Sequence, residues 1–283
     1  MTDRTTLSSC RICSLLLVSL LIVFCLALPS NCLSDVRKKS VFYLNSYHNG
    51  YHWSDGLLDG VRSVLNNSRY RVDLQIEYMD AKKFDYDIIS PNLLALYKEK
   101  FKGKEFDIII LSDNDALNFI NQHRSELFPD IPVVFCGIND LMDSDIATGN
   151  ITGVVEVYDF ISTLETAKTL HPEKNRLVIL IDNSTAGRAI RRQAEKLLAQ
   201  YDTDLQVEFW IQLSLEEAQK RVRKLPDDTF LFIAPYYQTI NGQFYTSEEV
   251  SEAIYRHSSV PIYTSWEFMV GYGAVGGKVL SGF

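Results

Sequence analysis

The sequence lacks the features that mark several common classes of protein. Its formal net charge is −8 and no basic stripe stands out, which argues against nucleic acid as a partner. Beyond the N-terminal apolar run only Cys32 and Cys136 remain, so no disulfide framework is predicted. No low-complexity linker interrupts the chain, and two lobes would therefore join through a tight hinge rather than a flexible tether.

Motifs for catalysis, metal binding and nucleotide binding are also missing or incomplete. The sequence has no nucleophile elbow, phosphate loop or zincin motif, so we expect this chain not to be an enzyme. His48 and His52 are four residues apart, but no third ligand stands at a suitable spacing, and no metal is predicted. Residues 271–276 match G-x-G-x-x-G without the surrounding βαβ unit, which favours a glycine-rich turn, and no cofactor is predicted.

The first 34 residues read as a targeting segment rather than as part of the fold. Arg4 and Arg11 precede an apolar run over residues 12–28, and Pro-Ser-Asn at 29–31 ends it. This length is close to the minimum for crossing a bilayer, so a cleaved signal peptide and an uncleaved signal anchor both stay open. The residues before Cys32 fit a lipid-modified cysteine poorly. The basic start predicts an extracytoplasmic (periplasmic) location, either free or anchored to the inner membrane.

Strand-like and helix-like segments alternate through the rest of the 283 residues. The expected strands are 41–44, 71–79, 107–111, 132–136 and 151–157, and then 176–181, 205–211, 229–234 and 260–263. Helical spacing or capping residues lie between them, for example at 53–65, from Ser90-Pro91, and at Ser214 and Thr246. This alternation predicts an α/β fold with two lobes, residues 35–157 and 158–275, each built on a parallel sheet covered by helices.

The most informative stretch is residues 46–53, Ser-Tyr-His-Asn-Gly-Tyr-His-Trp, which follows the first predicted strand. Five of these eight residues carry an aromatic or imidazole ring. Ligands of open α/β sheets bind outside the carboxyl ends of the strands, and rings there offer a stacking surface. The alternative interpretation is a hydrophobic staple at a helix start. We predict that Tyr47 and His48 contact a ligand and that Trp53 mainly packs on the core.

Polar or aromatic residues follow the other predicted strands as well. If the lobes face each other, these strand ends line one cleft. Rings would form its walls, helix starts at Asp115 and Ser184 would suit an anion, and carboxylates would meet an amine. The predicted ligand-binding residues are Tyr47, His48, Ser112, Asp113, Asn114, Asn139, Glu156, Asp182, Ser184, Thr185, Tyr236, Tyr237, Trp266 and Glu267. Helix capping is the alternative role for at least one residue of Asp113–Asp115.

Several of these segments also carry a family resemblance. They are Ser46-Tyr47-His48 with Trp53, Tyr78-Met79-Asp80, residues 111–117, residues 127–139 (Leu-Phe-Pro-x-x-Pro-Val-Val-Phe-Cys-Gly-x-Asn) and Thr152-Gly153-Val154. Together they resemble the type I periplasmic-binding-protein group called "ABC transporter substrate-binding protein". Close relatives form extracytoplasmic input domains of bacterial sensor histidine kinases and diguanylate cyclases. The likeness runs from about Val41 to the end and is strongest in the first lobe.

The resemblance implies a fold and a general activity. It implies two Rossmann-like lobes, three hinge crossings, and closure on a small solute, aromatic amino acids being among the ligands of related members. Such proteins continue beyond the segment that corresponds to Gly276-Gly277 and return to the first lobe. We therefore expect residues 276–283 to begin that return, the C-terminal part to be incomplete, and the chain to be a fragment or a truncated product.

Three classes of function follow from these observations, and the first of them, solute binding, has two forms. The leading hypothesis is a solute-binding sensory module whose partner is a fused kinase or cyclase domain. The alternative is the substrate-binding component of an ABC transporter, whose partner is a membrane permease. An exported α/β enzyme and a homodimerising scaffold without ligand are the rival classes.

Overall fold

The structure, a computed structural model, describes residues 37–147 and 149–277. The predicted targeting segment, 1–34, lies outside these residues, as do the last six residues of the chain. Among the described residues, no helix is both long enough and apolar enough to cross a membrane. Residues 39–68 and 72–277 belong to one compact unit, which contains two α/β lobes. The predicted fold class is confirmed.

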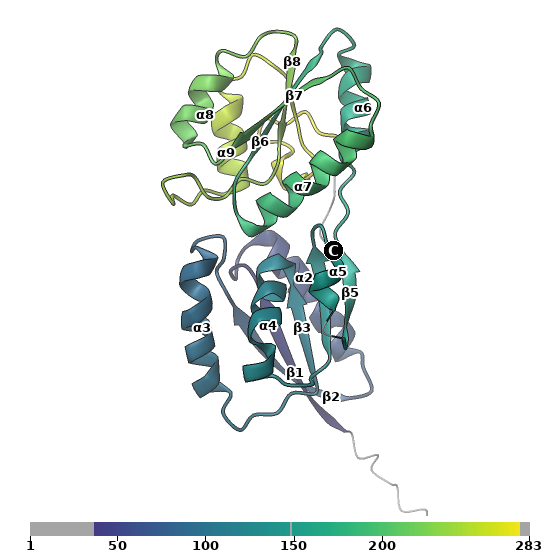
Figure 1. Cartoon of the computed structure of the whole chain (residues 1–283), viewed down its shortest axis with the longest axis vertical. Coiled ribbons are helices and arrows are strands. Elements are labelled where there is room, and N and C mark those ends of the chain that lie inside the picture. Colours follow the sequence, from purple (N-terminus) through teal and green to yellow (C-terminus); the bar gives the residue numbers. More distant parts are fainter. Residues whose placement is uncertain (1–36, 148, 278–283) are drawn as a thin grey trace, which may run out of the picture. The chain divides into compact units, whose positions relative to one another are not determined.

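The first lobe is a five-stranded sheet with strand order β2-β1-β3-β4-β5, flanked by helices (Figure 1). Its strands are β1 (Lys38–Asn45), β2 (Arg71–Tyr78), β3 (Ile108–Ser112), β4 (Val133–Ile138) and β5 (Ile151–Val155). Its helices are α2 (His52–Asn66), α3 (Tyr86–Lys100), α4 (Asp113–Leu127) and α5 (Asp143–Ile146). β1, β3, β4 and β5 run parallel to one another, as the continuous apolar strands predict.

The second lobe repeats this topology with the order β7-β6-β8-β9, and all three strand pairings are parallel. Its strands are β6 (Arg176–Ile181), β7 (Gln206–Ile211), β8 (Thr229–Ile233) and β9 (Ile262–Tyr263). Its helices are α6 (Phe160–Leu170), α7 (Thr185–Gln200), α8 (Leu215–Val222), α9 (Ser247–Tyr255) and the 3-10 turn η1 (Glu267–Met269). Residues 156–159 connect the two lobes.

Aromatic side chains hold each core together. In the first lobe Phe42 on β1 contacts four rings at centroid distances between 5.1 and 5.9 Å, those of Tyr97, Phe101, Phe106 and Phe128. In the second lobe Phe160 packs edge-on against Phe232 at 5.0 Å. Burying an aromatic ring contributes about 1.5–3 kcal/mol, so these clusters fix the sheets against their helices.

Strand order decides where a binding site can form. In each sheet the order reverses beside the first strand, between β1 and β3 and between β6 and β8. Such reversals leave a crevice at the carboxyl ends of the two strands. The segments that begin there are Ser46-Tyr47, Ser112-Asp113, Asp182 and Pro235–Tyr237. The sheets therefore present the polar and aromatic residues of interest at their switch points.

Most predicted helix starts are confirmed, and one is wrong. Ser214 and Thr246 cap α8 and α9 as predicted, each accepting a hydrogen bond from the backbone N–H three residues on. Helix α3 begins at Tyr86 instead of at Ser90-Pro91, because Asp85 caps it by accepting from Asp87 N. Pro91 lies inside this helix, where it removes one backbone hydrogen bond.

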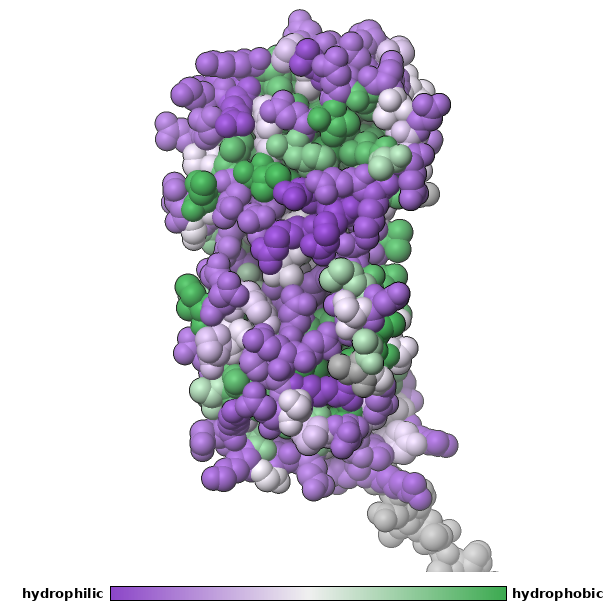
Figure 2. All heavy atoms as spheres, viewed as in Figure 1, coloured by the Kyte–Doolittle hydropathy of each residue, from purple (hydrophilic) through white to green (hydrophobic). Residues whose placement is uncertain are grey.

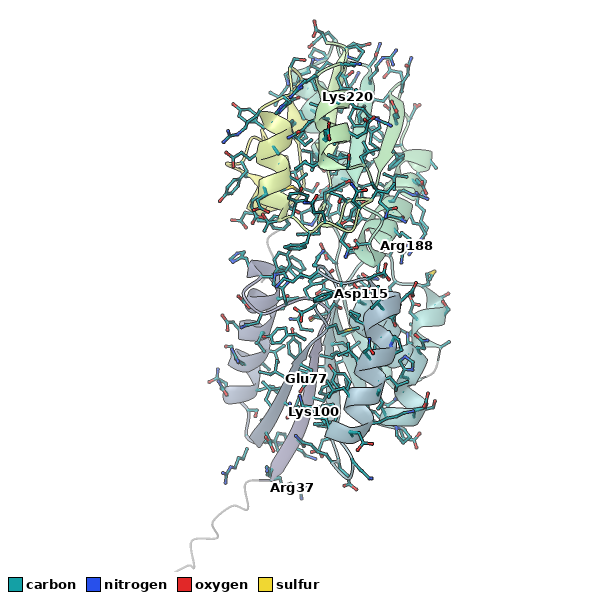
Figure 3. All side chains as sticks on the ribbon, turned by 90° about the vertical axis from the view of Figure 1, so that its left-hand side faces the viewer. Arg37, Glu77, Lys100, Asp115, Arg188 and Lys220 are labelled. Atoms are coloured by element: carbon teal, nitrogen blue, oxygen red, sulfur yellow. The ribbon has the colours of Figure 1, made fainter. Side chains whose placement is uncertain are left out.

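Hydrophilic residues cover most of the face seen in Figure 2, and an ion pair ties helix α3 to strand β2. Lys100 on α3 lies 2.6 Å from Glu77 on β2 (Figure 3). The G-x-G-x-x-G match forms a glycine-rich turn, as predicted, with positive φ at Gly271, Gly273 and Gly276. A Cβ at Gly273 would lie 2.2 Å from Tyr255 Cβ, so the close approach of this turn to α9 requires glycine.

Candidate functional site

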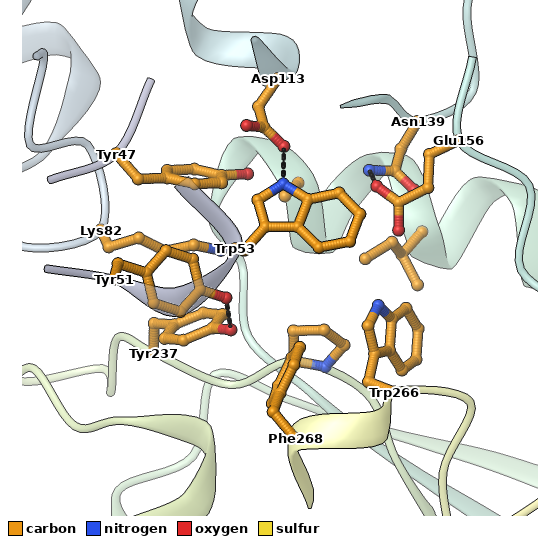
Figure 4. Close-up of a pocket in the computed structure, with 13 residues that line it drawn as sticks. Tyr47, Tyr51, Trp53, Lys82, Asp113, Asn139, Glu156, Tyr237, Trp266 and Phe268 are labelled. Atoms are coloured by element: carbon orange, nitrogen blue, oxygen red, sulfur yellow. Dashed lines mark hydrogen bonds between the residues drawn. The ribbon is translucent and has the colours of Figure 1, made fainter. Parts of the chain in front are cut away.

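A cleft at the carboxyl ends of both sheets is the candidate binding site (Figure 4). Its cavity volume is about 30 Å³, so a solute can enter only when the lining side chains or the two lobes move apart. The lining residues are Tyr47, Tyr51, Trp53, Lys82, Asp113, Asn139 and Glu156 from the first lobe and Ala186, Ile190, Pro235, Tyr237, Trp266 and Phe268 from the second. Six of the thirteen are aromatic and three are ionisable, which suits a small solute with a polar end and an apolar body.

Asp113, the first residue of α4, is fixed at the top of the cleft as Figure 4 draws it. Its backbone has φ 67°, a left-handed conformation in which aspartate is tolerated better than most residues. Trp53 Nε1 donates to Asp113 Oδ1 at 3.1 Å, while Oδ2 is buried without a partner. A Cβ at Gly137 would lie 3.2 Å from Asp113 Oδ1, so glycine there leaves room for this carboxylate.

Asn139 and Glu156 form the adjoining part of the wall. Asn139 Nδ2 donates to Glu156 Oε2 at 2.9 Å, whereas Asn139 Oδ1 is buried without a partner. The backbone of Asn139 is held by Asn114, which accepts from Asn139 N and donates to Asn139 O. Asn114 thus orients Asn139 without lining the cleft.

Lys82 follows β2 and is only 4% exposed, which is rare for lysine. Its ammonium nitrogen lies 3.6 Å from the ring centre of Tyr237 and 4.2 Å from that of Tyr47. Cations bind to ring faces at such distances. The hydroxyl groups of Tyr51 and Tyr237 are hydrogen-bonded to each other, so the rings around Lys82 come from both lobes.

The second lobe contributes its rings through two ordered segments. Tyr237 is held by its backbone N–H, which donates to Asp182 Oδ2 at 2.9 Å. Trp266 packs on Tyr158 with the ring centres 5.0 Å apart, and its indole faces Glu156 in Figure 4. Asp182 also accepts from Ser184 N and Ser184 Oγ, which joins the start of α7 to the segment after β8.

Burial dominates the electrostatics of the cleft. It raises the pKa of Glu156 to about 7, although hydrogen bonds from Asn139 and Trp266 lower it, and burial raises the pKa of Asp115 to about 6. The pKa of Asp113 lies well above its usual value because of burial and the nearby charge of Glu156. Burial lowers the pKa of Lys82 while the surrounding carboxylates oppose the shift. Among the described residues that line the cleft, Glu156 is therefore the acid whose pKa of about 7 lies close to neutrality.

These shifts predict a pH-dependent difference in stability. The unfolding free energy of Glu156→Gln minus that of the wild type should increase by about 1–3 kcal/mol as the pH rises from about 5 to about 8. The reason is that the raised folded-state pKa of Glu156 stabilises the wild type below the unfolded-state pKa of 4.5, and this contribution is lost as the pH rises through about 7. Urea denaturation of both proteins across this range measures the difference. Glu267→Gln is the control, and a difference for Glu156→Gln that does not change with pH contradicts the burial of an ionised Glu156.

The structure brings six of the predicted site residues together in the cleft, namely Tyr47, Asp113, Asn139, Glu156, Tyr237 and Trp266. The other eight do not line it. They are His48, Ser112, Asn114, Asp182, Ser184, Thr185, Tyr236 and Glu267.

Most of these eight have clear structural contacts. Ser112 accepts from Tyr43, and Ser184 caps α7 by accepting from Gly187 N. Tyr236 donates its hydroxyl to the carbonyl oxygen of Leu213, and Glu267 is exposed. His48 stacks on Tyr51 with the ring centres 5.6 Å apart and packs edge-on against Phe244 at 5.8 Å. Thr185 is hydrogen-bonded to Asp115, whose charge also interacts with Arg188.

Seven lining residues were not predicted, and three of them are the most informative. Lys82 lies four residues after the end of β2, and its place after a strand is the one feature of the sequence that indicates a position in the cleft. Tyr51 and Trp53 belong to the ring-rich stretch, but Trp53 was assigned to core packing. Its indole is half-buried, lines the cleft and donates to Asp113, so it combines packing with a place in the binding wall.

A second hollow lies on the first lobe, between α2 and the strands β4 and β5. Its lining is apolar apart from Glu156 and includes Val64, Val154 and Val157, which are 65–72% exposed. Because it holds almost no polar groups, it offers no specific recognition of a polar solute. The cleft with its carboxylates, amide and lysine is the stronger candidate for the functional site.

Comparison with known proteins identifies a family and agrees with the fold of two α/β lobes. A family model described as "ABC transporter substrate binding protein" matches residues 53–281. A search of curated proteins found no match. Among solved structures, a domain from Streptococcus pneumoniae in complex with L-Trp is 18% identical with a TM-score of 0.57, covering 84% of this chain and 76% of that one. A Bacillus halodurans solute-binding protein with bound myo-inositol is 13% identical, TM-score 0.51, covering 84% and 80%.

A further similar structure is the branched-chain amino acid transporter substrate-binding protein of Streptococcus pneumoniae in complex with isoleucine. It is 8% identical with a TM-score of 0.57, and the match covers 84% of this chain and 68% of that one. At these identities the structures establish the fold alone.

Proposed function

Because the chain belongs to the ABC transporter substrate-binding protein family, we propose that it is an extracytoplasmic domain that closes on a small solute in the cleft. The observation that carries this proposal is a cleft at the strand ends of two lobes, lined by six rings and by polar side chains. The family and the similar solved structures are binding proteins. Those structures were solved with amino acids and with myo-inositol, which sets the size of solute to test.

Contacts between the lobes support closure as the response to a solute. Tyr51 is hydrogen-bonded to Tyr237, and Asp140 forms ion pairs with Arg192 and Lys196 on α7 at 2.8 and 2.7 Å. A solute that binds better when these contacts are formed shifts the population toward the closed state. The proposed output of this shift is a signal to a fused histidine kinase or diguanylate cyclase. Delivery of the solute to a permease is the alternative, which the family supports equally.

Thermal denaturation in the presence of amino acids and polyols tests the binding function, because a solute that binds the folded state raises its stability. We expect Tyr237→Ala to weaken binding of the best solute about 10- to 100-fold, since the variant removes one ring from the wall. Tyr272→Ala removes an exposed ring outside the cleft and is the matched control. Equal binding by Tyr237→Ala and the wild type would count against the cleft.

The partner requires a separate experiment. A membrane span followed by a kinase or cyclase in the coding sequence beyond Phe283 would favour the sensor. A permease and an ATPase encoded beside it would favour transport. Neither result affects the test of solute binding.

A further inference from the structure

Two buried oxygens of the described cleft wall lack a hydrogen-bond partner, and both are acceptors when Asp113 is ionised, the form that a neighbouring cation favours over the neutral form that burial favours. Among the lining residues that the structure describes, they are Asp113 Oδ2 and Asn139 Oδ1. Their side chains belong to residues that are only 1% and 2% exposed. A buried acceptor without a donor is costly, so the complementary ligand group brings N–H or O–H donors.

The carboxylates of the cleft wall favour a cationic donor over a neutral one. Within residues 37–147 and 149–277, no ion pair includes Asp113 or Glu156. Their hydrogen bonds come from neutral groups, the indoles of Trp53 and Trp266 and the amide of Asn139. Buried carboxylates are stabilised far more by a cation than by neutral donors. A cationic donor, an ammonium group, satisfies both requirements.

The other carboxylates that the sequence offered for an amine are not available. Both carboxylate oxygens of Asp182 already accept hydrogen bonds, from Ser184 and from Tyr237. Glu267 is exposed and does not line the cleft. Lys82 is the one lysine or arginine among the lining residues, and its ammonium rests on the rings of Tyr47 and Tyr237. A ligand anion would meet it there.

We propose that the cleft recognises a solute by a primary ammonium group bound to Asp113, Asn139 and Glu156, and that Lys82 pairs with the carboxylate of a zwitterionic solute. This inference rests on the proposed function and names its substrate class. An amine without a carboxylate uses the acidic wall alone, and a zwitterion uses the acidic wall and Lys82. Carboxylates that carry neither an N–H nor an O–H group leave both of these oxygens unpaired and should not bind.

A matched set of compounds tests the ligand class. L-tryptophan, tryptamine and indole-3-propionate share one ring system and differ in charged groups. L-leucine, isoamylamine and isocaproate form the aliphatic set, and myo-inositol is the neutral compound. Thermal shift and titration calorimetry at millimolar concentrations should show binding only by compounds that carry an ammonium group. Mass spectrometry of the solute released from the purified protein, followed by binding of that solute, extends the test beyond the two sets.

Variants of the chain test the assigned residues. Asp113→Asn and Glu156→Gln should each weaken binding of the ammonium compound about 10- to 100-fold, because each removes a charge-assisted hydrogen bond at constant size. Lys82→Met keeps the side-chain stem and should weaken the zwitterion about tenfold or more while leaving the amine unaffected or bound more tightly. Glu267→Gln should bind like the wild type, and circular dichroism verifies that each variant is folded.

Several outcomes would overturn the inference while solute binding itself stands. They are tight binding of an acid or of myo-inositol with no ammonium compound bound, a released solute without an amine, or equal ammonium binding by Glu156→Gln and Asp113→Asn. If no compound binds and the purified protein releases no solute, both the inference and the proposed function fail. A released solute that carries an amine and loses affinity in Glu156→Gln supports the inference even when neither set binds.

Discussion

Replacing Asp182 by asparagine is expected to lower the free energy of unfolding by about 2–4 kcal/mol. The carboxylate is 2% exposed and accepts from Ser184 N, Ser184 Oγ and Tyr237 N at 3.0, 2.6 and 2.9 Å. Asparagine replaces one carboxylate oxygen of Asp182 by an N–H₂ group. This group is itself a donor and cannot accept a hydrogen bond, so a buried backbone or hydroxyl donor that faces it loses its partner. Urea denaturation followed by circular dichroism measures the loss.

Binding separates this structural role from a direct contact with solute. Asp182→Asn should also weaken solute binding, because Tyr237 loses the bond that holds its backbone, but the loss should accompany the loss of stability. Glu267→Gln changes an exposed carboxylate in the same lobe and should alter neither property. Undiminished stability together with lost binding would return Asp182 to the role that the sequence suggested, a carboxylate that touches the ligand.

Asp113 and Asp182 show where prediction from sequence ends. Each follows a buried strand and lies at the start of a helix, and the same reasoning placed both in a ligand site. Only the fold distinguishes them. Asp182 Oδ2 accepts a hydrogen bond from the backbone N–H of Tyr237, 55 residues away, whereas Asp113 Oδ2 has no hydrogen-bond partner. The pattern of strands predicts which ends of the sheet carry polar residues. The pattern contains no information on which of these polar side chains accept hydrogen bonds from the backbone of the protein itself.

Lys82 and α3 show the same limit at other scales. Lysine is normally exposed, so nothing local to residue 82 indicates an ammonium on two tyrosine rings, one of which belongs to the other lobe. At α3 the dipeptide Ser90-Pro91 is a good helix start, but Asp85 offers a cap five residues earlier, and the longer helix packs Tyr86 and Ile89 against the core. The strands, in contrast, were predictable because a continuous apolar run in an α/β chain has one stable place, the centre of a sheet.

Replacing Gly153 by alanine is expected to destabilise the first lobe by about 3 kcal/mol or more. Gly153 pairs with Phe135 in the register of β4 and β5, and a Cβ there would lie 2.2 Å from the carbonyl oxygen of Phe135 and 2.5 Å from its ring. Neither the backbone of a central strand nor a buried ring can move away cheaply. Glu156 is three residues further on, so displacement of β5 should also lower solute affinity.

Gly60→Ala is the matched control for this prediction, because it makes the same chemical change where space is free. Gly60 lies inside α2 with no atom within 4 Å of the added Cβ, and alanine there should stabilise the protein by about 0.5–1 kcal/mol. Urea denaturation of both variants gives shifts of opposite sign if β4 and β5 approach as closely as described. A Gly153→Ala variant as stable as the wild type would show that β5 can move away from Phe135, and the position of Glu156 would then not depend on this strand contact.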